Sequence, residues 1–462
     1  MMYRKPLAKR SLFLFLVPAM ALISWVGHPR RNGGDELQVP VTYYKLENGL
    51  KVVLSPDKTA PTVAVGVYYN IGFRIEPKNR TGFAHLFEHM MFQGSENLGK
   101  MEFIQLVQKN GGVLNGSTRF DFTNYWEVMP AHKLETALWA EADRMKGLKI
   151  TQENLTNQQG VVKNEVKVNV LNQPYGGFPW LDMPQYANKN WYNAHNFYGD
   201  LADLDSAKLE DVDAFFKTFY APNNAVLVVT GDFEIPAARK FIDQYFSKIP
   251  ASKLPPKPDL TEPAQEKEQR FTKEDKLAKK PALAVGYKMP ERNSPEYYAM
   301  GLIDQILVQG QDSRLYELLV QKKGYTSGVS GGINIGLGSM FDYNGPMLWV
   351  SNLTYDSTVS SDDILKQYDQ AISDLDKVTA EDLQLALVKI RSGLYDAMGG
   401  NFGIGKVNLL ACFALFDDNP SKINTLESEF KKVTPELIRK TAKQYLSPKN
   451  RTILIIEPKA PK

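Results

Sequence analysis

Two histidines and a glutamate near residue 85 carry the clearest chemistry in this sequence. His85, Glu88 and His89 form the pattern H-x-x-E-H within residues 82–94. On a helix, positions i and i+4 lie on one face with position i+3 beside them, so two imidazoles can bind one metal ion while the carboxylate reaches a bound water. The pattern predicts two zinc ligands, His85 and His89, and a general base, Glu88.

Chance explains this pattern poorly, because only five histidines occur in 462 residues. A histidine pair on an amphipathic helix can also be an ordinary core or surface pair, and that interpretation stays open on these residues alone. A catalytic zinc site needs three protein ligands and one open position. The third ligand must therefore come from elsewhere in the chain.

Glu165 is the candidate for the third ligand. Its segment begins with Thr151 as an N-cap, carries Glu153 in the first turn and ends before Pro174, which predicts a helix. Gly160 and several β-branched valines weaken that prediction. Taken by itself, Glu165 fits a solvated carboxylate on a helix face better than a metal ligand.

Several segments together resemble one family of metallopeptidases. They are Asn48–Leu54, the His85 motif with its Met90–Gly94 tail, Gly111–Thr118, Asp121–Tyr125, Val162–Glu165 and Asn172–Gly176. The family is that of the inverzincins, which includes pitrilysin, insulin-degrading enzyme and the mitochondrial processing peptidase. The resemblance covers nearly the whole chain, and it implies that Glu165 is the third zinc ligand.

The resemblance also implies a function. We expect a zinc metalloendopeptidase with one Zn²⁺ per chain that hydrolyses peptides or unfolded polypeptides. Asn115, Gly116 and Ser117 resemble the edge strand to which an extended substrate adds as a further β-strand. Without the family, the glycines here indicate only a turn and a weak strand.

The patterns along the chain predict an α+β fold with two homologous domains, each a mainly antiparallel sheet packed with helices. Residues 251–270 contain four prolines and few large apolar groups, which indicates a linker between domains at 38–250 and 271–462. Besides the motif helix, the elements predicted in the first domain are strands at 50–54, 62–69 and 122–129 and helices at 101–110 and 132–146.

An internal repeat supports this division. Residues 219–229 resemble residues 444–456, because each segment has a helix end, a proline turn and an apolar strand. Pro222 and Pro448 lie 226 positions apart. A uniform shift of 226 places the three motif residues opposite Gln311, Arg314 and Leu315, so the second domain is predicted to lack a metal site.

The second domain also departs from the family pattern. Active members carry an arginine and a tyrosine there that hold the substrate and help stabilise the transition state, and these places fall on Val320 and Ser327. We therefore expect a second subunit of the same family to supply both groups in a heterodimer, with a homodimer as the alternative. In the first domain, Gln158 stands where some relatives have a glutamate that supports the site.

Two functions without catalysis stay open. Relatives in respiratory complexes use this fold as scaffolding, so the chain could be a structural or assembly subunit. It could also be a peptide-binding or chaperone-like module that keeps zinc but cleaves poorly, since the arginine and tyrosine are missing.

Composition and the N-terminus limit the setting. The chain has 55 basic and 52 acidic residues, so its charge gives no case for nucleic-acid binding, and the single Cys412 excludes an intrachain disulfide. Basic residues precede an apolar run at 11–27, which predicts that residues 1–33 are a signal peptide or an N-terminal membrane anchor. We expect export to a bacterial periplasm, either free or anchored to the inner membrane.

Overall fold

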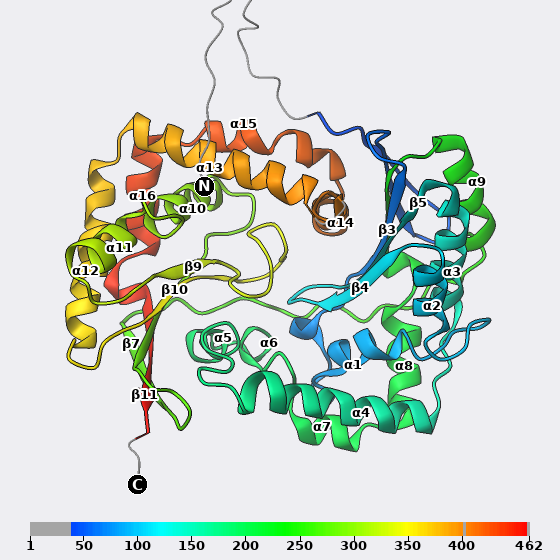
Figure 1. The fold of residues 1–462 in the computed structure, drawn as a ribbon, viewed down its shortest axis with the longest axis horizontal. Coiled ribbons are helices and arrows are strands. Elements are labelled where there is room, and N and C mark those ends of the chain that lie inside the picture. Colours follow the sequence, from blue (N-terminus) through cyan, green and yellow to red (C-terminus); the bar gives the residue numbers. More distant parts are fainter. Residues whose placement is uncertain (1–37, 401–402, 460–462) are drawn as a thin grey trace, which may run out of the picture. The chain divides into compact units, whose positions relative to one another are not determined.

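The computed structural model describes residues 38–400 and 403–459, which contain two β-sheets and many helices (Figure 1). The predicted leader at 1–33 lies outside the described residues. Within the described ranges, no single helix has the length and apolar character to cross a membrane; one sharply bent helix pair, Ala380–Gly399 with Ile404–Asp417, meets the criteria only when taken together.

The first sheet has six strands in the order β1-β2-β6-β3-β5-β4. Only the pair β2–β6 is parallel. The strands are β1 Thr42–Lys45, β2 Lys51–Pro56, β3 Thr62–Tyr69, β4 Val113–Thr118, β5 Thr123–Pro130 and β6 Ala225–Gly231. The helices of this half are α1 Phe83–Met90, α2 Glu102–Lys109, α3 Leu134–Lys146, α4 Gln152–Val166, α5 Asp182–Ala187, α6 Trp191–Ala194, α7 Leu201–Ser206, α8 Leu209–Phe219 and α9 Ile235–Phe246.

The second sheet has five strands in the order β7-β11-β8-β10-β9, and only β7–β11 is parallel. Its strands are β7 Gln269–Asp275, β8 Ala282–Lys288, β9 Ser330–Ile333, β10 Leu348–Thr354 and β11 Arg451–Pro458. The helices are α10 Pro295–Leu307, α11 Arg314–Tyr316, α12 Ser361–Ser373, α13 Ala380–Gly399, α14 Ile404–Asp417, α15 Leu426–Lys431 and α16 Pro435–Tyr445. Two mainly antiparallel sheets of matching strand order confirm the predicted α+β fold.

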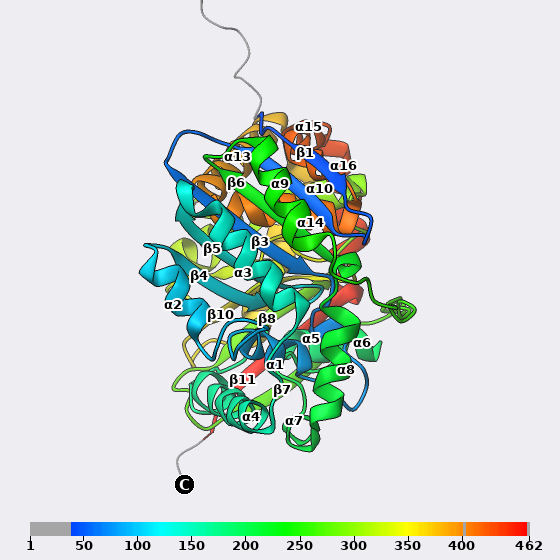
Figure 2. The ribbon, with the colours of Figure 1, turned by 90° about the vertical axis from the view of Figure 1, so that its right-hand side faces the viewer.

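Strand β3 shows why the first sheet is covered on both faces. Side chains alternate along a strand, so Val65 and Val67 pack into one core with α1 and α3, while Ala64 and Tyr68 pack into another. Helices α3 and α9 cover the first of these faces (Figure 2). The other face is covered by α14, a helix from the second half of the chain.

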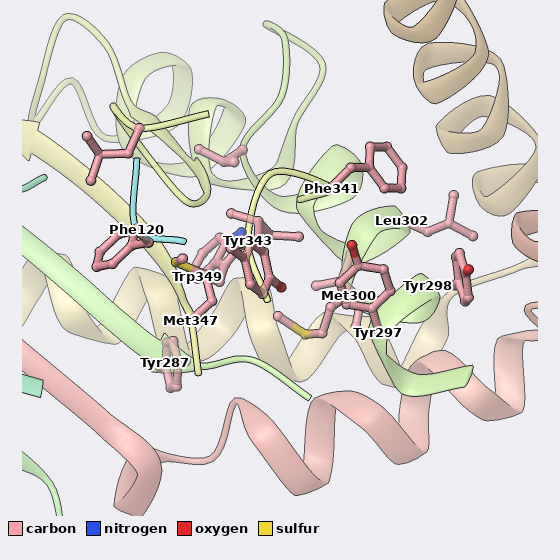
Figure 3. Packing of buried hydrophobic residues seen from close by; sticks show 14 of the residues in the cluster. Phe120, Tyr287, Tyr297, Tyr298, Met300, Leu302, Phe341, Tyr343, Met347 and Trp349 are labelled. Carbon is pink, nitrogen blue, oxygen red and sulfur yellow. The ribbon is translucent and has the colours of Figure 1, made fainter. Parts of the chain in front are cut away.

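The two halves share a continuous core. Helix α5 of the first half packs on β8 and β11 of the second sheet, as α14 packs on β2, β3 and β6 of the first. Phe120 lies in the same buried cluster as Met347 and Trp349 (Figure 3). Nearby, the backbone N–H of Asn344 donates to the Asp121 carboxylate at 2.7 Å.

The strand registers show that a uniform shift of 226 residues is wrong before β10. Tyr69 pairs with Ala225, and Tyr287 pairs with Arg451, so β3 and β8 are offset by 218 residues while β6 and β11 are offset by 226. The second half therefore has more residues between β8 and β11 than the first half has between β3 and β6. The helix that follows β8 is α10, and the offset of 218 places Ile303, Ile306 and Leu307 opposite the three motif residues.

Candidate active site

Helix α1 carries the H-x-x-E-H residues between α4 and the strands β4 and β5. It begins after Gly82, whose φ of +82° lies in the left-handed region that favours glycine. A Cβ at Gly82 would lie 2.6 Å from the carbonyl oxygen of Tyr198, so the helix also approaches that loop closely. Six of the eight residues are buried, His85 among them, while Glu88 and His89 are partly exposed.

Glu165 reaches α1 from the last turn of α4. The predicted N-cap is confirmed, because the Thr151 hydroxyl accepts a hydrogen bond from the Asn154 N–H at 3.2 Å. Leu155 and Val162 are fully buried, and this packing holds the helix despite Gly160 in its middle. The side chain of Glu165 remains 29% exposed.

The structure brings the three predicted ligands together. His85 Nε2 lies 3.3 Å from His89 Nε2 and 3.6 Å from Glu165 Oε2, and His89 Nε2 lies 3.3 Å from the same Glu165 oxygen. Tetrahedral zinc with bonds of about 2.0–2.1 Å separates its ligand atoms by about 3.3 Å. The donor atoms and their spacing therefore fit Zn²⁺, and within the described residues this is the one His/Cys/Asp/Glu group with such spacing.

The surroundings of Glu165 favour its charged form. Hydrogen bonds from His85 and His89 hold the pKa of the Glu165 carboxyl well below its ordinary value. The Tyr198 hydroxyl donates to Glu165 Oε1 at 3.3 Å, which leaves the other oxygen toward the histidines. Burial, together with the charge of Glu165, raises the pKa of Tyr198 to about 12, so this hydroxyl keeps its proton at neutral pH.

The ring of His85 is held in an unusual way. A metal-binding histidine almost always donates its other ring N–H to a carboxylate, carbonyl or water. His85 Nδ1 is buried and has no such partner among the described protein atoms. The ring instead lies against the aromatic rings of Tyr198 and Phe197, at centroid distances of 5.0 and 5.9 Å.

Strand β4 contacts α1 at Glu88. The Thr118 hydroxyl donates to Glu88 Oε2 at 2.8 Å. The predicted substrate residues Asn115, Gly116 and Ser117 lie on the same strand, which is an edge of the six-stranded sheet. The Gly116 N–H already donates to Asn115 Oδ1 at 2.9 Å, so an added peptide strand would compete with that contact.

The departures noted in the sequence have clear locations. Val320 lies partly buried in the short π-helix Glu317–Lys322, and Ser327 is exposed in the loop before β9. Gln158 is buried within α4, two turns before Glu165.

Sequence reasoning missed two side chains that contact the site residues. Thr118 was part of the recognised strand pattern, yet nothing in the spacing showed that its hydroxyl would reach Glu88. Tyr198 belongs to no motif in the chain, and only the fold brings it to Glu165.

Comparison with known proteins identifies the family. Residues 51–190 match the family model described as Insulinase (Peptidase family M16), and residues 206–387 match Peptidase M16 inactive domain. The chain is 28% identical over 283 residues to the zinc protease PqqE of Helicobacter pylori, an alignment that covers 60% of this chain and 63% of that protein. The chain therefore matches less than two thirds of that relative's length.

Two solved structures share the fold. A protease from Helicobacter pylori superposes with a TM-score of 0.82 and 22% identity, covering 91% of this chain and all of the other. The periplasmic protease PqqL from Escherichia coli has a TM-score of 0.72 and 17% identity, covering 92% of this chain and 48% of PqqL. The two M16 models together span more than two thirds of the sequence. This chain belongs to the M16 family of peptidases.

Proposed function

We propose that the chain is a zinc metalloendopeptidase whose metal is held by His85, His89 and Glu165. The observation that carries the proposal is the spacing of the three ligand atoms, which lie 3.3–3.6 Å apart. Beside them lies the carboxylate of Glu88, which forms no salt bridge with a lysine or arginine among the described residues. The names of relatives such as the zinc protease PqqE support the same metal.

In this proposal Glu88 is the general acid and base. When bound, Zn²⁺ lowers the pKa of water and polarises a carbonyl group. Glu88 takes the proton of the attacking water and then gives it to the leaving amine. Thr118 keeps the Glu88 carboxylate oriented, and Tyr198 keeps Glu165 oriented toward the histidines.

The substrate is a peptide or an unfolded polypeptide in extended form. Asn115, Gly116 and Ser117 present the free edge of β4, and backbone hydrogen bonds along such an edge bind a strand with little regard to its sequence. Because Thr118 is the last residue of this strand and contacts Glu88, a docked peptide would lie beside Glu88.

A second subunit of the same family completes the site in this proposal. Val320 and Ser327 cannot replace an arginine and a tyrosine, because neither offers a charged planar donor or a phenol. A heterodimer fits this lack better than a homodimer, which would repeat it. We also propose that residues 1–33 direct export to the periplasm.

A catalytically silent role is the second candidate, and Val320 and Ser327 favour it. The chain would then be an assembly subunit or a peptide-binding module of the same fold. Zinc content and hydrolysis of a quenched peptide library separate the candidates, using the chain without residues 1–33, alone and with a same-family partner. Zinc without hydrolysis in both samples would favour the silent role.

The Glu88→Gln variant tests the base directly. Glutamine keeps the shape and the contact with Thr118 but cannot carry the proton, so we expect bound zinc to be unchanged and kcat to fall by about 10²–10⁴-fold. Hydrolysis at the wild-type rate by this variant would rule out Glu88 as the base.

A further inference from the structure

Glu76 is a buried carboxylate that has no part in the proposed reaction. It follows the short turn η1 Phe73–Ile75 and is fully buried. Its oxygen Oε1 accepts a hydrogen bond from the Ala84 N–H at 2.6 Å, and Oε2 accepts one from the Gly82 N–H at 2.9 Å. Both donors belong to the start of α1, and Ala84 immediately precedes the ligand His85.

The start of a helix needs such a partner. The first N–H groups of a helix have no partner within it, and they carry the positive end of the helix dipole. Residue 82 is a glycine and offers no side chain to cap them. Glu76 satisfies these N–H groups from outside the helix, at the end where the dipole favours a carboxylate. Burial raises the pKa of the Glu76 carboxyl, and the hydrogen bonds from His195, Ala84 and Gly82 oppose that rise.

His195 holds Glu76 from the other side. His195 Nε2 lies 2.5 Å from the carbonyl oxygen of Phe73 and 3.7 Å from Glu76 Oε2, and His195 Nδ1 lies 3.0 Å from the carbonyl oxygen of Trp191. Carbonyl oxygens only accept hydrogen bonds, and a neutral imidazole has one N–H. His195 thus donates a ring N–H to one of these carbonyl oxygens, while its Nε2 lies within ion-pair distance of the Glu76 carboxylate.

The place of His195 is itself fixed by packing. Its ring stacks on the Trp191 indole with centroids 4.3 Å apart and planes 9° apart, and its side chain is only 6% exposed. The ammonium of Lys78 lies over the same indole at 5.4 Å. The pair formed by Glu76 and His195 thus links the start of α1 to α6, an element that carries none of the proposed metal ligands.

We propose that Glu76 and His195 are positioning residues that set the metal affinity of the site by fixing the first turn of α1. The reason lies in His85, whose Nδ1 has no hydrogen-bond partner among the described atoms and so lacks the contact that usually orients a metal-binding histidine. Its orientation then depends on the aromatic rings of Tyr198 and Phe197 and on the helix backbone, which Glu76 contacts one residue away. The inference rests on the zinc site of the proposed function.

Metal affinity tests this proposal without any need for turnover. Glu76→Gln keeps the size of the side chain, but its NH₂ group would face a backbone N–H, and the negative charge is lost. We expect Zn²⁺ affinity, measured by competition with a chromophoric chelator, to fall by about 10-fold in folded protein. The absorption spectrum of the Co²⁺-substituted protein should change as the ligand geometry loosens.

His195→Gln and the double variant show whether the two residues act together. His195→Gln should weaken Zn²⁺ binding in the same direction, and the double variant should be no weaker than Glu76→Gln alone, because one removed partner already breaks the pair. If Glu76→Gln does not fold, His195→Gln carries the test. Equal, independent losses that multiply in the double variant would overturn the paired role.

Asp143→Asn is the matched control. Asp143 is also buried and accepts hydrogen bonds from Ser95 and from the Asn97 backbone, and among the described residues it makes no hydrogen bond to α1. We expect this variant to lower Tm while Zn²⁺ affinity stays unchanged. Equal loss of affinity in this control, or wild-type affinity in folded Glu76→Gln and His195→Gln, would overturn the inference while leaving the zinc site intact. A wild-type chain that binds no Zn²⁺ would instead overturn the proposed function and this inference with it.

Discussion

The candidate metal site and its counterpart in the second half use one framework with different side chains. Helix α1 packs against α4 and the edge strand β4, and α10 packs in the same way against α13 and the edge strand β9 (Figure 1). The offset of the preceding strands places Ile303 and Leu307 opposite the two histidines, and both are fully buried. The aliphatic side chains complete a core where the first half leaves donor atoms facing one another.

The edge strands β4 and β9 also differ by a polar side chain in the first half and an apolar one in the second. Asn115 lies opposite Trp126 and Ser330 lies opposite Asn352, so Thr118 of β4 corresponds to Ile333 of β9. The hydroxyl that contacts Glu88 is thus replaced by an alkyl group. A fold of this kind depends on which positions are apolar, whereas its chemistry depends on a few side chains that can change without loss of the framework.

A buried acid, Asp304, lies next to Ile303 in the second half. Asp304 of α10 lines a cavity of about 520 Å³ between α10, β9 and α13. Its carboxylate accepts hydrogen bonds from Trp349 Nε1 at 2.7 Å and from Gln309 Nε2 at 3.1 Å, and burial raises its pKa from 3.8 to about 6. The pKa of Asp304 is raised by burial, whereas the pKa of Glu165 is lowered, because only Glu165 has histidine side chains beside it.

Removal of a proposed zinc ligand should give the largest difference between substitutions in the two halves. We expect His89→Ala to lose bound Zn²⁺ and hydrolysis, an effect larger than the roughly 100-fold that follows loss of an outer partner. The matched variant Leu307→Ala should keep Zn²⁺ and lose about 2–5 kcal/mol of stability through the cavity it leaves. Metal content after dialysis and urea unfolding measure both, and retained Zn²⁺ in His89→Ala would contradict the ligand set.

The raised pKa of Asp304 should make the free energy of unfolding depend on pH. Folded Asp304 holds its proton up to about pH 6, whereas the unfolded chain releases it near pH 3.8, so this group makes the free energy of unfolding fall as pH rises between these values. The shift corresponds to about 3 kcal/mol at most. Asp304→Asn should remove this part of the fall, seen by urea unfolding at pH 4 and pH 7. Identical pH dependence in both proteins would refute the assignment.

The Thr118 contact should give the smallest effect. Thr118→Val keeps the shape but removes the donor to Glu88, and a hydrogen bond to a charged group accounts for about a 10-fold change in kcat. We expect KM and Zn²⁺ content to stay unchanged, and Thr118→Ser to restore most of the rate. A change in Zn²⁺ content rather than kcat would show that Thr118 acts on the helix and not on the base.

Much of the first half could be predicted because its patterns are local. The alternation at 62–69 gave the bounds of β3, and the Thr151 cap gave the start of α4. The correspondence between the halves could not be predicted from one shift, since the repeat that revealed it lies after β5 and β10. The second half has extra residues between β8 and β10, so the offset between corresponding residues differs before β10. The repeat lies after these residues and does not show the difference.

The sequence alone determined the pair of histidines and the nearby glutamate, because residues at i, i+3 and i+4 share a face on any helix. Only the tertiary structure decided which distant groups meet them. Glu165, Thr118 and Glu76 each reach α1 from a different element, and their contacts depend on how α4, β4 and the turn before α1 pack around it. Spacing along a chain fixes neighbours within a helix, whereas contacts between elements follow from burial of the whole core.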